Sequence, residues 1–447
     1  MRASGWNLAH CFRSFTMQYY STLKKAEPVN FKQATITGQA PDKGLYFPEK
    51  VPMFDSKLLS DWKNIGKNEL AFRIMKPYVN GEIPEEMLQD IVAETIDFDF
   101  PLVPITDRIW SLELFHGPTL AFKDVGARFM SRCLGYFNKG NQKKVTVLVA
   151  TSGDTGGAVA NGFENVEGIE VIILYPEGKV SPVQELQLTT CGNNITALKV
   201  NGNFDDCQAM VKQAFMDKDL NEHYQLTSAN SINVARWLPQ QLYYCFALQQ
   251  WGFDEAPVIS VPSGNFGNIC AGMLAWKSGL KVDHFIAACN ANDVVPRFLL
   301  GDDYEPRKAV ATLSNAMDVG DPSNFVRIME LFVQDKNALQ QMISSQSVCD
   351  ETTLATIKQV FQRNGYLLDP HGAVGYKALE DYLQMHPGKK GILLETAHPV
   401  KFPDVVKQAT GQEVPIPENV KPLFEKTPKS IGMDASFEAL QKWLLNR

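Results

Sequence analysis

The 447-residue sequence lacks the cysteine pattern of a disulfide-rich or zinc-binding protein. Its eight cysteines include no CxxC pair, and several lie within apolar segments. This pattern predicts reduced, buried thiols in a cytosolic protein, with neither a disulfide framework nor a zinc cluster. The seven histidines form no HExxH motif or other close ligand spacing. We therefore expect no metal site.

An excess of basic residues is also missing. The net charge is −7, with 45% hydrophobic and 21% charged residues, which is typical of an ordinary soluble protein of two or three domains. This charge argues against nucleic-acid binding. No apolar run is long enough to span a membrane. The expected partner is a small-molecule substrate, and the chain is expected to be a monomer or a homodimer.

The first 26 residues lack acidic side chains, although four of them are Lys or Arg. Such a composition occurs in transit peptides. Only two arginines precede Met17, however, and the amphipathic pattern is weak. We favour the alternative that residues 1–16 are an extra N-terminal segment, either disordered or the product of a misassigned start, and that the protein is cytoplasmic.

Apolar runs alternate with helical patterns over most of the chain after Pro101. Such runs indicate a buried parallel sheet covered by helices on both faces, which is an α/β fold. The mixed segment 17–101 is expected to be an N-terminal domain. Two local signals are specific: the capping box that begins at Ser181, and Pro239, which predicts a kink in a long helical pattern.

Ligands bind at the carboxyl ends of the strands in such sheets, so the loops that directly follow strands are the candidate site. Four loops qualify: 116–123, 151–157, 263–268 and 396–399. The first places Lys123 in the opening turn of a helix, where the helix dipole disfavours a cation. Taken alone, Lys123 is either a solvated surface lysine, the commoner fate, or a nucleophilic amine.

Two of the other loops are suited to anions. Loop 263–268 places two glycines and two asparagines ahead of a helix, which suits a phosphate group, although a structural turn would explain it equally well. It is neither a P-loop nor a GxGxxG motif. Loop 151–157 suits a smaller anion held by Ser152 and Thr155, and Asp154 makes it unsuitable for a diphosphate. A simple helix cap is the alternative there.

Polar side chains elsewhere complete the candidate set. Arg236, close to Asn230 and Ser231, would suit bidentate phosphate binding, with a surface salt bridge as the alternative. Thr396 ends the last strand, where its hydroxyl can bond a ring nitrogen. His398 is either a general base or a buried histidine bonded to backbone. Together, an amine, two phosphate-sized sites and a hydroxyl for a heterocycle imply pyridoxal phosphate.

The segment His116-Gly-Pro-Thr-Leu-Ala-Phe-Lys-Asp124 resembles the cofactor-lysine signature of threonine synthases, within the tryptophan-synthase-β-like family of fold type II. The resemblance covers about residues 17–411. It includes six further motifs in the order of that family: GLYFP (44–48), SGDTG (152–156), SINVARW (231–237), SGNFGN (263–268), DPHGAVG (369–375) and TAHPVKF (396–402). One departure is Gly372, where many relatives are expected to have threonine.

The resemblance implies a fold type II pyridoxal-phosphate enzyme with mostly parallel twisted sheets, helices on both faces and an N-terminal threonine-synthase domain. Residues 102–447 would form the catalytic region, with about 146–250 as a smaller mobile subdomain. The implied activity converts O-phospho-L-homoserine and water to L-threonine and phosphate by γ-elimination and β-addition of water, the last step of threonine biosynthesis.

The resemblance also implies a role for each candidate residue. Lys123 would hold the cofactor as a Schiff base and carry protons. The cofactor phosphate would be bound by Gly264, Asn265, Phe266, Gly267 and Asn268, and the pyridine nitrogen by Thr396. The substrate carboxylate and part of its phosphate would be bound by Thr151, Ser152, Asp154 and Thr155, and the rest of that phosphate by Asn230, Ser231 and Arg236.

Two alternatives stay open at the level of sequence. Another fold type II enzyme, such as a threonine dehydratase or a cysteine synthase, would share the cofactor site, but it would not need the second phosphate site. A catalytically silent cofactor-binding protein, or a phospho-amino-acid lyase, would keep the fold and most of the motifs.

Overall fold

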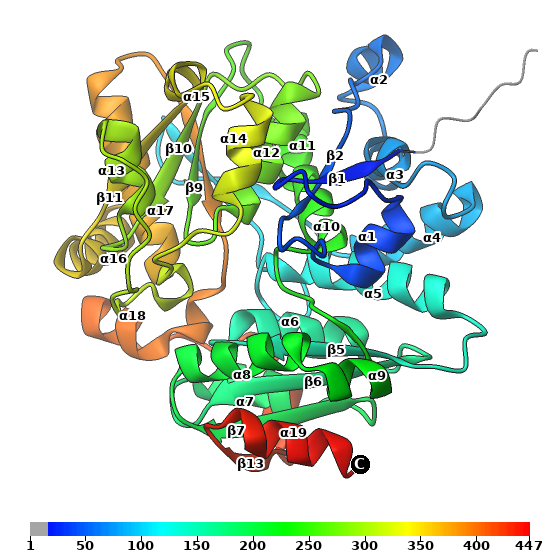
Figure 1. The fold of residues 1–447 in the computed structure, drawn as a ribbon. Coiled ribbons are helices and arrows are strands. Elements are labelled where there is room, and N and C mark those ends of the chain that lie inside the picture. The colour runs from blue at the N-terminus through cyan, green and yellow to red at the C-terminus, as the bar shows by residue number, and fades with distance from the viewer. Residues whose placement is uncertain (1–16) are drawn as a thin grey trace, which may run out of the picture.

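The structure is a computed structural model, which describes residues 17–447 (Figure 1). The predicted extra segment 1–16 lies outside the described residues. None of the described helices is long and apolar enough to cross a membrane.

The larger sheet has six strands and contains the apolar runs identified in the sequence. Its order is β11-β10-β9-β12-β4-β3, and every pair is parallel except β3 with β4. The bounds are β3 (Leu102–Pro104), β4 (Ile109–Glu113), β9 (Val258–Pro262), β10 (His284–Cys289), β11 (Ile343–Ser347) and β12 (Gly391–Glu395). The central strands β9 and β12 are buried at every residue.

Helices cover both faces of this sheet, because alternate side chains of a strand point to opposite sides. On β12, Ile392 and Leu394 pack into one core cluster with α11 (Gln241–Gln250) and α12 (Gly267–Lys277). Leu393 packs into a second cluster with α17 (Pro370–Met385). A strand that is buried on both faces favours apolar residues on both of its sides, which explains the nearly continuous apolar runs.

The smaller sheet has five strands in the order β13-β7-β6-β5-β8, all parallel. The bounds are β5 (Val145–Ala150), β6 (Ile169–Pro176), β7 (Ile195–Asn201), β8 (Gln225–Thr227) and β13 (Ile431–Asp434). The strand β13 and the following helix α19 (Phe437–Leu445) return from the C-terminus to this unit (Figure 1). The unit therefore extends beyond the predicted range 146–250.

The N-terminal part consists of a two-stranded antiparallel sheet and four helices. The strands are β1 (Tyr19–Ser21) and β2 (Tyr46–Pro48), and the helices are α1 (Phe31–Thr37), α2 (Ser56–Asp61), α3 (Lys67–Val79) and α4 (Glu85–Thr95). Tyr19 donates to the carbonyl of Tyr78 at 2.7 Å, and Tyr78 donates to Gln241 of α11 at 3.2 Å. The N-terminal part thus packs directly on the helices of the larger sheet.

The remaining helices connect the strands or lie at the ends of the sheets. They are α5 (Lys123–Asn138), α6 (Asp154–Phe163), α7 (Pro182–Thr189), α8 (Phe204–Met216), α9 (Lys218–His223), α10 (Val234–Trp237), η1 (Leu238–Gln240), α13 (Val294–Leu300), η2 (Asn315–Met317), α14 (Phe325–Leu331), α15 (Lys336–Met342), α16 (Asp350–Asn364), η3 (Pro399–Lys401), α18 (Pro403–Thr410) and η4 (Lys421–Glu425).

Both local signals are confirmed. Ser181 and Gln184 form the predicted capping box at the start of α7. The pattern around Pro239 splits into α10, a 3₁₀ turn that contains the proline, and α11. The proline has no N–H to donate, so the helical bond is interrupted there.

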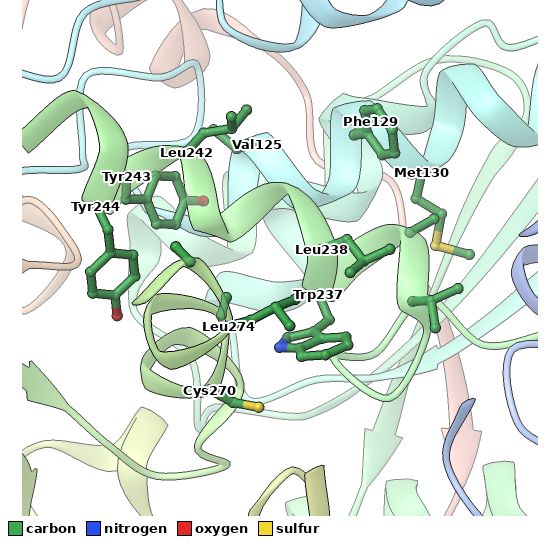
Figure 2. Packing of buried hydrophobic residues seen from close by; sticks show 14 of the residues in the cluster. Val125, Phe129, Met130, Trp237, Leu238, Leu242, Tyr243, Tyr244, Cys270 and Leu274 are labelled. Carbon is green, nitrogen blue, oxygen red and sulfur yellow. The ribbon is translucent and has the colours of Figure 1, made fainter. Parts of the chain in front are cut away.

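Helix α5 packs against α10 and η1, in the apolar cluster that also contains residues of α11 and α12 (Figure 2). Val125, Phe129 and Met130 of α5 lie in the same fully buried cluster as Trp237 and Leu242. Tyr243 adds a polar tie, since its hydroxyl donates to the carbonyl of Phe122. The first residue of α5 is Lys123, so this packing fixes the backbone that carries the candidate amine.

Candidate active site

The candidate loops emerge at the carboxyl ends of neighbouring strands. In the larger sheet β9, β12 and β4 are adjacent, and they lead to loops 263–268, 396–399 and 114–123. In the smaller sheet β5 and β8 are adjacent, and they lead to loops 151–153 and 228–233. In each sheet the candidate residues therefore lie together at the carboxyl ends of the strands.

Direct contacts connect the candidate loops of the two sheets into a single site. The amine of Lys123 lies 3.9 Å from a carboxylate oxygen of Asp154. The amide of Asn265 donates to the hydroxyl of Ser231 at 2.7 Å. Within the larger sheet, the N–H of Phe122 donates to the carbonyl of Thr396 at 2.9 Å. The structure thus brings the predicted loops together, although no single pair was predictable from spacing.

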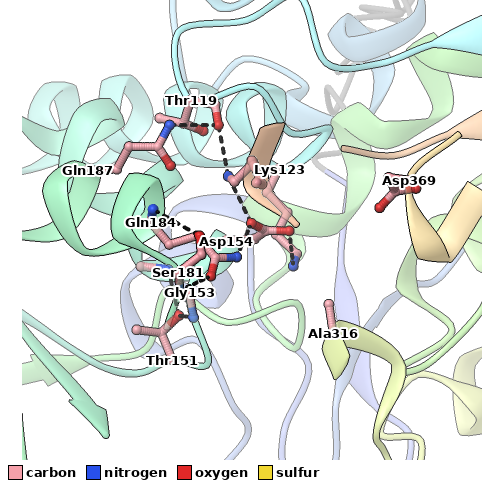
Figure 3. A network of polar contacts seen from close by, with 12 residues as sticks. Thr119, Lys123, Thr151, Gly153, Asp154, Ser181, Gln184, Gln187, Ala316 and Asp369 are labelled. Carbon is pink, nitrogen blue, oxygen red and sulfur yellow. Dashed lines mark hydrogen bonds and ion pairs between the residues drawn. The ribbon is translucent and has the colours of Figure 1, made fainter. Parts of the chain in front are cut away.

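Lys123 is a largely buried amine, with 18% of its side chain exposed. Burial lowers its pKa, which the nearby carboxylate of Asp154 partly opposes. The loop before it is fixed by Thr119, whose N–H donates to the carboxylate of Asp124 at 2.9 Å. Figure 3 shows Lys123 directed at Asp154, with Asp369 and Ala316 across the site. The surface interpretation of Lys123 is therefore wrong.

Loop 263–268 fits the phosphate of pyridoxal phosphate. Phe266 has φ +59°, and the first N–H bonded inside α12 is that of Cys270, which donates to the carbonyl of Phe266 at 3.1 Å. The preceding N–H groups point out of the helix start. The amide nitrogen of Asn268 is buried without a hydrogen-bond partner, while Tyr244 donates to its oxygen at 2.9 Å. A bound phosphate would accept from the N–H groups at the helix start and from the amide nitrogen of Asn268.

Close packing explains the glycine at the start of this loop. A Cβ on Gly264 would lie 2.6 Å from the backbone Cα of Met317. Backbone atoms cannot move aside as a flexible side chain can, so a larger residue would displace the loop.

Thr396 is 6% exposed and directly follows β12, beside the Lys123 loop. His398, two residues on, accepts from the N–H of Val400 at 3.1 Å and so caps η3. Burial, together with the neighbouring His116, lowers the pKa of His398 to about 4. The imidazole is therefore neutral at neutral pH, and its bond to the Val400 N–H agrees with the second alternative, a histidine bonded to backbone.

In loop 151–157 the side chain of Thr151 is already engaged. Its hydroxyl accepts from the N–H groups of Gly153 at 3.0 Å and Gly156 at 2.9 Å, which shapes the turn into α6. Gly153 has φ +134°, a conformation that favours glycine. Ser152 and Thr155 remain partly exposed beside this turn. Thr151 thus supports the loop, whereas Ser152 and Thr155 can reach a ligand.

Asp154 begins α6 and is almost fully buried, at 5% exposure. Burial opposes its ionisation, but the ammonium groups of Lys401 and Lys123 outweigh burial and hold the pKa of its carboxyl well below the usual value. Its Oδ1 accepts from Lys401 Nζ and from Gln184 Nε2, both at 2.8 Å. Asp154 is therefore an ionised carboxylate inside a site predicted to bind anions.

Arg236 is buried, at 4% exposure, so the alternative of a surface salt bridge is wrong. One terminal nitrogen donates to the carbonyl of Ala229 at 2.5 Å, and its Nε has no hydrogen-bond partner. Burial lowers its pKa to about 10, so the guanidinium stays charged at neutral pH. This buried guanidinium forms no ion pair within 4 Å among residues 17–447, with Asp124 as the acid that acts on its charge, and an anionic ligand would stabilise it further.

Ser231 lies between the two phosphate-sized sites. Its hydroxyl also accepts from Asn324 at 3.1 Å, and Arg327 donates to its carbonyl at 3.2 Å.

Arg327 is fully buried and further donates to the carbonyl of Tyr46 at 2.9 Å. Asn230 precedes this network, and its carbonyl accepts from Asn233 at 3.1 Å. Arg327 therefore ties the GLYFP turn to the loop of Ser231, a link without a sequence signal.

Gly372 leaves room for a buried acid next to Thr396. A Cβ at this position would lie 1.6 Å from Oε2 of Glu395. Glu395 is fully buried and receives the N–H of Asp369 at 2.8 Å. Burial and the neighbouring Asp369 raise the pKa of Glu395 well above its usual value. Glycine at position 372, in place of the threonine expected in many relatives, thus fits the position of the Glu395 side chain.

We predict that Gly372→Ala lowers the free energy of unfolding by about 1–3 kcal/mol, since overpacking a filled core costs that much. Denaturant unfolding measures it. Gly252→Ala is the matched control, because Gly252 is exposed and a Cβ there would meet nothing within 4 Å. A Gly372→Ala protein as stable as this control would contradict the packing argument.

Comparison with known proteins defines the class first. Residues 102–394 match the family described as "Pyridoxal-phosphate dependent enzyme". With the buried amine, the phosphate cradle and the parallel sheets, this match identifies a pyridoxal-phosphate-dependent enzyme of fold type II.

Further matches define the particular family. Residues 18–96 match "Threonine synthase N terminus", and residues 372–444 match "Threonine synthase, C-terminal". The chain is 43% identical over 431 residues to threonine synthase of Serratia marcescens, covering 96% of this chain and 99% of that protein. The chain belongs to the threonine synthase family, as the sequence motifs predicted.

Solved structures agree with this assignment. Crystal structures of threonine synthase from Escherichia coli (42% identity, covering 96% of this chain and 100% of that one) and of the pyridoxal-phosphate-bound enzyme from Brucella melitensis (35%, covering 96% and 99%) both superpose with a TM-score of 0.89. The predicted family, fold class, cofactor and lyase activity are confirmed.

Proposed function

We propose that this site converts O-phospho-L-homoserine and water to L-threonine and phosphate with the residues assigned below. The observation that supports it best is the contact of Lys123 with Asp154, because this contact places a buried amine between the cradle of the larger sheet and the anion loops of the smaller one. Such a position suits an amine that must reach both a cofactor and a substrate.

The cofactor would lie against the larger sheet. Gly264, Asn265, Phe266, Gly267 and Asn268 would hold its phosphate through the start of α12 and the unpartnered amide of Asn268. Thr396 would offer its hydroxyl to the ring nitrogen. When bound, pyridoxal phosphate supplies an electron sink that stabilises negative charge on the carbon atoms of the substrate.

Lys123 would hold the cofactor covalently through its amine and then carry protons. Burial lowers its pKa, so more of the amine is neutral near pH 7 than for a solvated lysine. A neutral amine can take the proton from Cα of the substrate. Loss of a second proton, from Cβ, would let phosphate leave Cγ. Water would then add its hydroxyl to Cβ and give its other proton to phosphate, and the two protons taken from Cα and Cβ would be returned to Cα and Cγ.

The substrate carries a carboxylate and a phosphate, and the smaller sheet would supply most of the groups that bind them. Ser152 and Thr155 would donate to the carboxylate and part of the phosphate, on a loop shaped by Thr151 and Asp154. The rest of the phosphate would be bound by Asn230, Ser231 and Arg236. The unpartnered Nε of the buried guanidinium would gain an anionic acceptor in this arrangement.

Because the groups come from two sheets, the smaller unit is proposed to close over the substrate and exclude water. In this division residues 17–101 form the N-terminal domain and 102–447 the catalytic region, with about 146–250, together with β13 and α19, as the part that moves. A cytoplasmic location and a monomeric or homodimeric state complete the proposal.

The purified protein, loaded with pyridoxal phosphate, is expected to release threonine and phosphate from O-phospho-L-homoserine in equal amounts. Amino-acid analysis and a phosphate assay measure the two products. Phosphate without threonine would show a phospho-amino-acid lyase instead, and neither product would show a catalytically silent member of the family.

A further inference from the structure

Lys401 is a fully buried lysine with two strong hydrogen bonds in the active site. Its Nζ donates to the carbonyl of Thr119 and to Oδ1 of Asp154, each at 2.8 Å. Thr119 belongs to the Lys123 loop, and Asp154 opens α6. Lys401 itself ends η3, just after Thr396. One ammonium group therefore links two of the four candidate loops to the 3₁₀ turn that follows Thr396.

Two glutamines complete this contact network on the α7 side. Gln187 donates to the same carbonyl of Thr119 at 3.0 Å, and Gln184 donates to Oδ1 of Asp154 at 2.8 Å. Figure 3 shows Thr119, Asp154 and both glutamines around this position. The hydrogen bonds to Oδ1 leave Oδ2 of Asp154 facing Lys123.

An ionised Asp154 would on its own work against the proposed reaction in two ways. It would repel the carboxylate and the phosphate of the substrate, which bind on the same loop. It would also stabilise the ammonium form of Lys123, 3.9 Å away, whereas the reaction needs the free amine. A cation that engages Asp154 from the opposite side removes both effects.

We propose that Lys401 is a positioning residue, whose ammonium neutralises Asp154 so that loop 151–157 accepts an anionic substrate and Lys123 keeps a free amine. This inference rests on the proposed function. A purely structural role explains the residue less well, because a buried ion pair costs desolvation that apolar side chains of the same size avoid.

The charges around Lys123 agree with this assignment. Asp154 and Asp369 favour its protonated form, while Lys401 and Arg236 disfavour it, in addition to burial. Of the two cations, only Lys401 contacts Asp154 directly. Removal of Lys401 would therefore take away the main counter-charge of Asp154 and leave only that of Lys123 beside it.

A double-mutant cycle tests the proposal. Lys401→Met is expected to raise KM for O-phospho-L-homoserine about 100-fold, in the range measured when one partner of a buried charge pair is removed. Lys401→Met with Asp154→Asn is expected to recover about tenfold of that loss, because the double variant lacks the uncompensated carboxylate. Lys407→Met is the control, since Lys407 is 57% exposed and pairs only with Glu413 on the surface.

A second measurement separates this role from simple support of the fold. The pH dependence of the visible absorbance of the bound cofactor reports the ionisation of its environment without turnover. Lys401→Met is expected to move the midpoint to higher pH by about one unit or more, and the double variant to return it towards wild type. If Lys401→Met does not fold, Lys401→Gln is measured in the same way, since it can still donate to Thr119.

Independent effects of the two substitutions, with an unchanged absorbance midpoint, would overturn the proposal. A wild-type protein inactive on O-phospho-L-homoserine would instead refute the proposed function. The absorbance titration would still test Lys401 in that case, so the two failures are distinguishable.

Discussion

Lys123→Ala is expected to abolish threonine formation, with kcat reduced about 10⁴-fold or more, because the amine serves both as covalent anchor and as proton carrier. Each role alone contributes orders of magnitude. The remaining hydrogen bonds of the site cannot replace a base placed at Cα. Product release from O-phospho-L-homoserine, measured over hours, sets the residual rate.

The control for this substitution is Lys139→Ala, at the exposed C-terminal end of the same helix, which is expected to keep full activity. Added small primary amines are expected to restore a measurable part of the lost rate in Lys123→Ala, since the cavity left by the side chain can admit them. A Lys123→Ala protein with activity within tenfold of wild type would remove Lys123 from the chemistry.

The sequence predicted the part of the fold that depends on continuous apolar runs. Strands such as β9 and β12 are buried on both faces, so most of their positions are apolar, and the loops after them were identifiable. Edge strands lack this property. β11 has the sequence Ile-Ser-Ser-Gln-Ser, and β13 is mostly exposed, so neither carries a hydrophobic signal. Their pairing depends on partners distant in the chain.

The residues of the candidate site could be predicted from the sequence only in part, as the fold could. Residues in strand-end loops, such as Lys123 and Asn268, were identified because the position itself suggests a ligand. Lys401 and Arg327 were not, because nothing local distinguishes a buried lysine or arginine from a solvated one. Lys401 lies within a quoted motif, TAHPVKF, but its role depends on Thr119 and Asp154, which are far away in sequence.

The burial of Arg236 leads to the second large effect. Arg236→Ala is expected to raise KM for O-phospho-L-homoserine about 100-fold, or ~3 kcal/mol, because a buried charged hydrogen-bonding partner of the phosphate is lost. The affinity for pyridoxal phosphate, measured by titration of its absorbance, is expected to change less than about threefold, since the proposed site of the cofactor phosphate is the start of α12. Equal loss of both would refute the role given to Arg236.

Two further comparisons sharpen this prediction. Arg297→Ala is the control, because Arg297 forms an exposed pair with Asp302 away from the site, and it is expected to leave KM unchanged. Inorganic phosphate, used as a competing ligand, is expected to inhibit the wild type more strongly than Arg236→Ala. The difference would show that the guanidinium acts on the phosphate rather than on the shape of the loop.

The stability of the substrate-free protein gives the last test of this assignment. A buried guanidinium with an unpartnered Nε destabilises the fold, so Arg236→Met, which keeps the volume without the charge, is expected to have an equal or higher Tm than wild type. Natural sites often retain such unfavourable groups for binding. A large drop in Tm would instead mean that Arg236 holds the carbonyl of Ala229 for structural reasons, because a stabilising group and an unsatisfied ligand-binding group change stability in opposite directions.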